Sequence, residues 1–314
     1  MTRLLILLLI AVSAQADVTY KRRTTTLGFG ASEGTSTEYF TADRSASEST
    51  MRWTRGLMKT MTGGKEVAST SIVRLDKELI WEIDPKQKEY KEMSFAEFRE
   101  LIGKLSTETG EAADGEPVDT TAEEMYEWKV ETLSDPDPKN INGFSCRNLK
   151  IVATGTNKQD ANDRVMITVD FWNSPDVPGQ QDAAAFATAY AKALGFDIEA
   201  TRPGFQQAIM LYQKQFNELA EAAKQAPGVA VRSLVEIKRN QLVGPNVGQA
   251  MKEGMKNEVL GKLPFGKKKE PKQEPPKYEE RIKFSVESEL LEANSTAVEA
   301  AKFEAPTGYK LKKK

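Results

Sequence analysis

The chain of 314 residues contains no histidine. Histidine is the base in Ser-His-Asp and Cys-His catalytic sites and a frequent ligand of catalytic zinc, so its absence excludes these sites. Carboxylate pairs can hydrolyse glycosides without histidine, but the 46 acidic residues form no recognisable catalytic motif. We therefore expect a protein that is not an enzyme, with no cofactor and no metal site.

Only one cysteine is present, Cys146, so no disulfide can form within the chain. It lies in an apolar run typical of a strand, together with Phe144, Leu149 and Ile151. This context favours a packed thiol over a reactive one. Pairing with a second molecule remains an alternative in an oxidising compartment.

Neither sign of charge dominates, because 44 basic residues face 46 acidic ones. Binding to nucleic acid requires a basic surface, so no nucleic-acid partner is expected. A membrane-spanning helix needs about 20 apolar residues, and no stretch of the chain reaches that length. We expect no transmembrane segment in the mature chain. Hydrophobic residues make up 39% of the chain, enough for a real core.

The first sixteen residues have the pattern of a secretory signal peptide. Arg3 provides a positive charge, Leu4 to Val12 are all apolar, and Ala14-Gln15-Ala16 fits the small-x-small cleavage site. No cysteine follows the cleavage point, which disfavours a lipid anchor. The sequence thus predicts a signal peptide over 1–16, cleavage after Ala16 and a periplasmic protein.

Alternating apolar and polar residues over most of 17–314 predict one antiparallel sheet in a single domain of the α+β class. The clearest examples are 79–83, 164–172 and 281–290. The predicted strands are 17–26, 35–42, 47–55, 67–75, 79–83, 88–93, 125–133, 144–154, 164–172, 229–239 and 281–290.

Helices are predicted within this sheet domain at 95–105, 182–194, 205–226 and 247–260. Ser94 and Glu97 form a capping box before the first of them. Two segments have the composition of flexible loops, the acidic 106–122 and the Lys/Pro-rich 261–280. An alternative interpretation of the second loop is that its basic residues contact anionic lipid headgroups.

Three segments together resemble a known family: 73–95, Ile141 to Cys146, and 301–310 with Pro306-x-Gly308-Tyr309. They are similar to an uncharacterised family of exported bacterial proteins, domain of unknown function 4412. That family is similar in strand pattern to the periplasmic lipoprotein-carrier and lipoprotein-receptor fold. The resemblance implies an unclosed β-barrel, a large curved antiparallel sheet with helices on its concave face, where acyl chains are held.

Two functions follow as alternatives. The first is an exported, non-catalytic protein that binds or carries an apolar ligand, such as a lipid or a lipoprotein acyl chain, in a hydrophobic cavity between the sheet and the helix at 205–226. The second is a structural or interaction protein of the cell envelope, with an envelope protein as partner and no small ligand. If the protein is a carrier, large or adaptable apolar side chains are expected to form the wall of its ligand cavity. The candidates are Trp81, Met166, Trp172, Met210 and Phe216.

The signal peptide leads to a direct test. We expect the exported protein to begin at Asp17, because signal peptidase cleaves after the small residue Ala16. N-terminal sequencing of the protein from the periplasmic fraction checks this. A mature protein that retains Met1 or Leu4 contradicts the export prediction.

Overall fold

A computed structural model describes residues 17–28, 30–108, 125–195, 228–243 and 277–312 of the chain. The predicted signal peptide 1–16 and the predicted helices 205–226 and 247–260 lie outside these ranges. The remaining predicted strands and helices fall within them.

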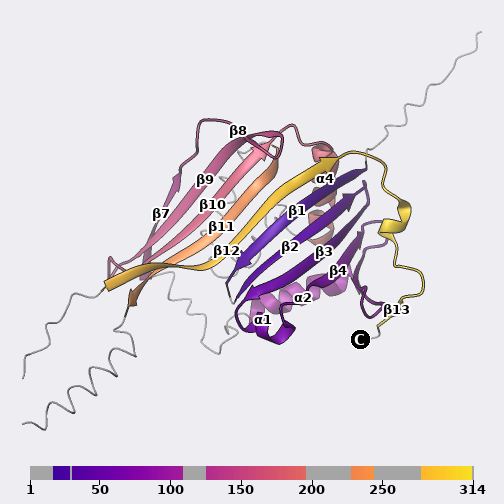
Figure 1. Cartoon of the computed structure of the whole chain (residues 1–314), viewed down its shortest axis with the longest axis horizontal. Coiled ribbons are helices and arrows are strands. Elements are labelled where there is room, and N and C mark those ends of the chain that lie inside the picture. Colours follow the sequence, from indigo (N-terminus) through magenta and orange to yellow (C-terminus); the bar gives the residue numbers. More distant parts are fainter. Residues whose placement is uncertain (1–16, 29, 109–124, 196–227, 244–276, 313–314) are drawn as a thin grey trace, which may run out of the picture.

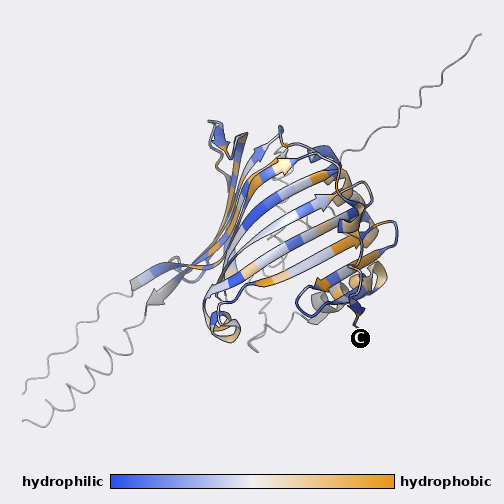
Figure 2. Cartoon of the chain, turned by 45° about the vertical axis from the view of Figure 1, so that its right-hand side comes forward, coloured by the Kyte–Doolittle hydropathy of each residue, from blue (hydrophilic) through white to orange (hydrophobic). Residues whose placement is uncertain are grey.

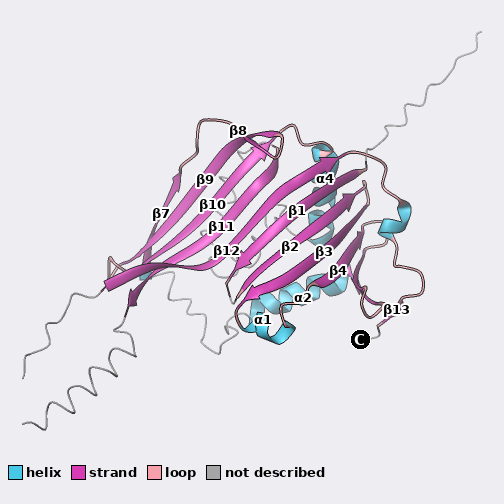
Figure 3. Cartoon of the chain, viewed as in Figure 1, coloured by secondary structure: helices cyan, strands magenta, loops and turns pink. Residues whose placement is uncertain are grey.

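Thirteen strands form one large mixed sheet that does not close on itself (Figures 1 and 3). Their order is β13-β6-β5-β4-β3-β2-β1-β12-β11-β10-β9-β7, and β8 pairs with β9 beside this path. The prediction of a large unclosed antiparallel sheet is confirmed, with one parallel pairing, β13 with β6, at an edge. The strands are β1 (Val18–Leu27), β2 (Ala31–Phe40), β3 (Arg44–Arg55), β4 (Val67–Arg74), β5 (Leu79–Asp84), β6 (Glu89–Ser94), β7 (Tyr126–Thr132), β8 (Lys139–Ile141), β9 (Phe144–Asn157), β10 (Arg164–Ser174), β11 (Val229–Val243), β12 (Lys277–Asn294) and β13 (Lys310–Leu311).

The middle of the sheet is the antiparallel pairing of β1 with β12. Nine residues of β1 are paired, from Thr19 with Asn294 to Leu27 with Ser285. The register shifts between Lys21 and Arg22, where β12 has one extra residue, Leu291. The pairing joins a half made of β1–β6 to a half made of β7–β12. The two halves therefore form one continuous surface.

Short helices accompany the strands within the described residues: α1 (Leu57–Thr62), α2 (Phe95–Glu108), α4 (Gln180–Leu194) and the 3-10 helix η2 (Ala300–Phe303). The predicted capping box begins α2. The backbone N–H of Ser94 donates to Glu97 Oε2 at 2.8 Å, and the backbone N–H of Glu97 donates to Ser94 Oγ at 3.2 Å. Two backbone donors at the start of the helix are thereby satisfied.

Both α2 and α4 pack on one face of the β2–β6 region, which we call the helix face (Figure 3). The ring of Phe40 on β2 lies 5.8 Å from that of Phe186 on α4. Val73 and Ile80 reach the same cluster from β4 and β5. The expectation that helices fill the concave side of the sheet stays a prediction.

The opposite face of β3–β5 is covered by the C-terminal segment, and we call it the tail face. Ile72 and Trp81, the sequence neighbours of Val73 and Ile80, pack there against Phe303 of η2. Successive residues of a strand point to opposite faces, so this region carries a core on each side. Phe303 is 1% exposed.

Each of the two predicted loops was wrong at one boundary. Helix α2 continues to Glu108, so the first three residues of the expected loop 106–122 are helical. Strand β12 begins at Lys277, so the last four residues of the expected loop 261–280 belong to a strand. The polar residues 277–280 are extended because β11 offers them backbone partners at 240–243. The rest of both loops lies outside the described residues.

The prediction that Cys146 is packed is confirmed. Its side chain is 0% exposed and belongs to a cluster with Trp172, Val177 and Leu290. Burial raises the pKa of the thiol, because the charged thiolate is poorly solvated there.

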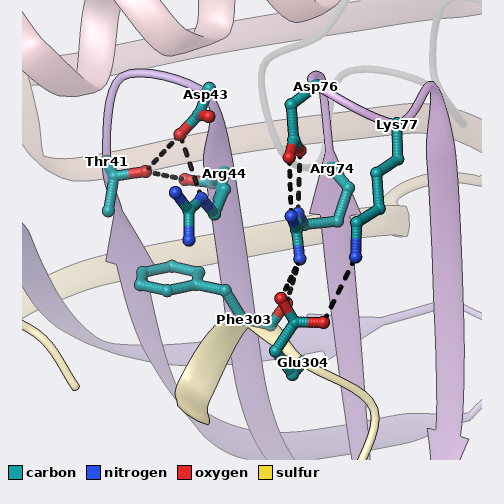
Figure 4. A network of polar contacts seen from close by, with 8 residues as sticks. All are labelled: Thr41, Asp43, Arg44, Arg74, Asp76, Lys77, Phe303 and Glu304. Carbon is teal, nitrogen blue, oxygen red and sulfur yellow. Dashed lines mark hydrogen bonds and ion pairs between the residues drawn. The ribbon is translucent and has the colours of Figure 1, made fainter. Parts of the chain in front are cut away.

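Arg74, the last residue of β4, is a buried cation that fastens the C-terminal segment to the sheet (Figure 4). It is 4% exposed. Its Nε and Nη2 donate to the two carboxylate oxygens of Asp76 at 2.8 and 2.6 Å. Its Nη1 donates to the carbonyl of Phe303 at 3.1 Å and pairs with Glu304, which also accepts from Lys77.

These contacts shift the pKa values of Arg74, Asp76 and Glu304. The hydrogen bond from Arg74 holds the pKa of Asp76 below its usual value. Burial alone would raise the pKa of Glu304, but the hydrogen bond and charge of Arg74, with Lys77, lower it. The pKa of Arg74 is raised, chiefly by the hydrogen bond to Asp76. All three shifts favour the charged forms of Arg74, Asp76 and Glu304 at neutral pH.

Replacing Arg74 tests this attachment. We expect Arg74→Met to lower the free energy of unfolding by about 3 kcal/mol. Asp76 loses its ion-pair partner, Glu304 keeps only Lys77, and the carbonyl of Phe303 loses its donor. The matched control is Arg52→Met, which breaks the exposed ion pair with Glu33 and should cost about 0–1 kcal/mol. Urea unfolding followed by circular dichroism measures both. Equal losses in the two variants would show that the cluster is an ordinary surface contact.

The same cluster predicts acid sensitivity. The folded-state pKa values of Asp76 and Glu304 are lowered, so their contribution to stability is complete above their unfolded-state values of about 4. It is lost as the pH falls through the lowered folded-state values. Unfolding free energy measured from pH 6 downwards, in steps of roughly half a unit, should therefore fall less steeply in Arg74→Met than in the unmodified chain. If the unfolding free energies of both chains fall equally steeply with pH, Arg74 is not the cause of the lowered pKa values of Asp76 and Glu304.

Candidate functional site

The helix face continues across the β1–β12 pairing into the second half of the sheet, β7–β12. Residues directly opposite each other on paired strands share a face. Val169 pairs with Val235, Val235 with Val286, and Val286 with Thr26 of β1. Since Thr26 and Val18 lie on one side of β1, and Val18 pairs with Phe40, this is the face that carries α4. Figure 2 shows the hydrophobic and hydrophilic positions along these strands.

On β9–β11 the helix face is apolar, and we call this part the apolar cluster. Among the described residues, the partly buried hydrophobic side chains that pack against this cluster also come from strands, namely β7, β11 and β12. None of the cluster's residues is more than 8% exposed, so they form a buried apolar layer on this face of the sheet. Its buried residues are Leu149, Ile151, Ala153, Val165, Ile167, Val169, Phe171, Val235 and Ile237.

Trp128 on the edge strand β7 extends the apolar cluster over Gly155 of β9, its directly paired residue. A Cβ atom at Gly155 would lie 2.9 Å from the Trp128 indole, which is closer than packed carbon atoms approach. Glycine therefore allows the indole to lie across the neighbouring strand. The Trp128 ring also contacts that of Tyr126, with 6.2 Å between centroids.

Away from α2 and α4, the same face of β1–β4 carries many small hydroxyl side chains, and Met51, Trp53 and Val67 lie on it near the β3–β4 turn. The hydroxyl residues Ser36, Ser49 and Ser69 are directly paired across three strands. Ser49 Oγ lies 2.9 Å from Ser69 Oγ. Most of these side chains are half-buried. The helix face thus changes from hydroxyl-rich to apolar along the strand order. Its other hydroxyl residues on β1–β4 include Thr24, Thr26, Ser32, Ser45, Ser47 and Ser71.

A half-buried ion pair lies near the boundary between these two regions. Arg22 Nε is 3.4 Å from Glu38 Oε2, and the two side chains are 15% and 22% exposed. Arg22 Nη1 also donates to the carbonyl of Ala230 on β11 at 3.1 Å, across β12. The pair therefore spans both halves of the sheet and places charge next to the apolar cluster.

Asn173 supplies a buried polar group without a partner. It follows Phe171 by two residues on β10, so both lie on the same side of the strand. Asn173 is 3% exposed, and its Nδ2 makes no hydrogen bond. A buried amide donor without an acceptor is rare, because it costs free energy that a bound acceptor would recover.

Of the cavity-wall residues predicted from the sequence, the three that the structure describes do not belong to the apolar cluster. Trp81 lies on the tail face of β5, where its Nε1 donates to Glu92 at 2.8 Å. Met166 neighbours Ile167 in sequence, so it lies on the opposite side of β10 from the apolar cluster. Trp172 is 9% exposed, with Lys139 Nζ 4.5 Å from its ring. Met210 and Phe216 lie outside the described residues.

Apolarity alone selected these residues, and it does not tell which face of the sheet a side chain occupies. The pairing register decides that. The signals available in the sequence for the observed cluster were the alternation of Val165, Ile167, Val169 and Phe171, together with the glycine at 155. Arg22 and Asn173 gave no signal in the sequence, because their role depends on strands far apart in the chain.

Among the described residues, three further features bear on function: a pocket, the grouping of possible metal ligands and the length of the helices. A pocket of about 240 Å³ lies at the β5–β6 edge beside Lys312, but Glu82, Asp84, Glu89 and Lys91 make its lining largely charged. Within the described ranges, no three His, Cys, Asp or Glu residues are grouped as a metal site. No helix of those ranges is both long and apolar enough to cross a membrane.

Comparison with known proteins adds no relative. No protein-family model, curated protein or solved structure matches this chain. The resemblance to the exported family of unknown function therefore rests on the sequence motifs at 73–95, 141–146 and 301–310, and it stays a prediction.

Proposed function

We propose that this protein is an exported, non-catalytic protein of the periplasm that binds or carries an apolar ligand, such as a lipid or a lipoprotein acyl chain. The observation that carries the proposal is the apolar cluster on the helix face of β9–β11. Its described hydrophobic neighbours are other strands, whereas the helix face of β2–β6 is packed by α2 and α4.

The energetics of the proposal are those of hydrophobic burial. Each methylene of an acyl chain that leaves water contributes roughly 0.8 kcal/mol. Contact with a few strands is therefore enough for measurable affinity. The apolar cluster has few side chains that donate or accept hydrogen bonds. This composition suits a ligand that is recognised by its apolar area.

The surroundings of the apolar cluster favour an amphipathic ligand over a pure hydrocarbon. The Arg22–Glu38 pair and the unsatisfied Nδ2 of Asn173 lie on the same face, and the hydroxyl-rich region continues beyond them. A polar headgroup placed towards β1 could accept a hydrogen bond while its chain lies on β9–β11. Such placed polar groups fix the orientation of ligands in apolar sites.

Strand β12 provides a matched pair of variants. Phe284 is half-buried, pairs with Ile237 and packs against the apolar cluster. The register shift at Lys283, between Ile282 and Phe284, places Ile282 on the opposite face, where it is 43% exposed. We expect Phe284→Ser to weaken the binding of a fluorescent fatty acid by about tenfold, because apolar contact area is lost. Ile282→Ser should bind as the unmodified protein does.

Native mass spectrometry of protein purified from the periplasm provides an independent measurement. Lipid that stays bound through purification would support a carrier, and circular dichroism must show that both variants are folded. If the folded protein shows no saturable binding and no lipid co-purifies, the carrier proposal is wrong. The structural or interaction protein of the envelope is then the better description.

A further inference from the structure

The hairpin between β3 and β4 ends in an exposed apolar surface that the fold does not use. Leu57 and Met61 of α1 are each 71% exposed. They are four residues apart and therefore lie on the same side of the helix. Met51 and Val67, a directly paired couple at the strand ends, are 38% and 50% exposed.

This surface is not the edge of a core. The six residues of α1 include no buried residue. Met58 and Thr62 are half-buried, and the hydroxyl of Thr62 donates to the carbonyl of Met58 at 2.7 Å. The helix is thus held by its other side, while Leu57 and Met61 point into solvent.

Positive charge surrounds the apolar side chains. Residues 51–67 contain four basic residues, Arg52, Arg55, Lys59 and Lys65, and Glu66 is the one acidic residue. Arg52 pairs with Glu33. The structure gives Arg55, Lys59 and Lys65 no ion pair with any described residue. We call this surface the α1 tip: Met51, Arg52, Arg55, Leu57, Lys59, Met61, Lys65 and Val67.

We propose that the α1 tip docks on the surface of a membrane that contains anionic phospholipid. Leu57 and Met61 would enter the boundary between headgroups and acyl chains, and the surrounding basic side chains would contact phosphate groups. Apolar side chains on one side of a short element with Lys and Arg around them form the pattern of interfacial membrane contacts. Each basic residue near an anionic surface adds to the attraction.

The dimensions and charge of the α1 tip argue against a partner protein or a second copy of the chain as its binding partner. A helix of six residues with two prominent side chains offers far less area than a stable protein interface, which buries about 800 Å² per partner. Two copies that met through the same surface would bring like charges together, which opposes association. A lipid surface needs neither a large area nor a shaped partner.

The position of α1 allows this contact without rearrangement of the sheet. The helix lies at the tip of the β3–β4 hairpin, at the lower margin of the molecule in Figure 1. Gly56 precedes it with a φ of 85°, and Gly63 follows it with a φ of 65°. These left-handed positions, which favour glycine, turn the chain sharply at both ends and present the helix outwards.

Flotation of the full mature chain with lipid vesicles tests the proposal. We expect co-flotation with vesicles of phosphatidylcholine and phosphatidylglycerol, weaker binding at high salt, and little binding to phosphatidylcholine alone. The double substitution Leu57→Ser and Met61→Ser should reduce binding by at least about tenfold. Both residues are exposed, so the variant should fold normally.

The matched control is Leu133→Ser, because Leu133 is 53% exposed and lies outside the α1 tip. It should float as the unmodified chain does. A polarity-sensitive dye on the thiol of the Leu57→Cys variant adds a local readout, since the native Cys146 is fully buried. The dye emission should shift to the blue on anionic vesicles.

Three results would overturn the proposal. The first is no flotation of the unmodified chain with anionic vesicles. The second is flotation that the double substitution leaves unchanged, which would place the lipid contact elsewhere. The third is a dye shift that depends on protein concentration and needs no lipid, which would identify the α1 tip as a contact between two copies. Lipid binding at the helix face would survive the double substitution at Leu57 and Met61, so the two lipid contacts give different results.

Discussion

The antiparallel pairing of β1 with β12 is the constraint on which the rest of the structure depends. It joins residues 271 positions apart, such as Lys21 and Glu292, which also form an ion pair. Ordering a segment between such distant partners costs conformational entropy that only the completed sheet offsets. Without this seam, β1 and β12 would each present an open edge, and the helix face would end between its apolar and hydroxyl-rich parts.

The continuity of the helix face matters because its chemistry changes along the strand order. At one end α2 and α4 fill it with aromatic side chains, such as Phe186 and Tyr190. In the middle it carries serine and threonine hydroxyls, and at the other end aliphatic side chains. A ligand with a polar and an apolar part would find both kinds of surface on one face. The α1 tip adds an apolar surface of a different kind, small, cationic and directed away from the sheet.

Local patterns predicted the elements well, whereas long-range pairing could not be read from the sequence. The alternation at 164–172 and the Ser94–Glu97 pair fixed a strand and a helix start, because neighbouring residues alone determine both. Helix α1 was missed because its six residues are too few to show a helical period. The face occupied by Trp81 or Met166 depends on register with strands elsewhere, so their assignment to one cavity had no physical basis in the local pattern. The role of Arg74 depends on Glu304, 230 residues away.

The single cysteine has a consequence for how the protein would mature outside a reducing compartment. Cys146 has no partner in its own chain, and the folded cluster with Trp172 and Leu290 excludes oxidants and other thiols. Folding therefore needs no disulfide isomerase, and the folded molecule does not form mixed disulfides through Cys146. Covalent dimers can arise only from chains that meet while this cluster is open. Under oxidising conditions, the abundance of such dimers would thus record how long newly made chains spend unfolded.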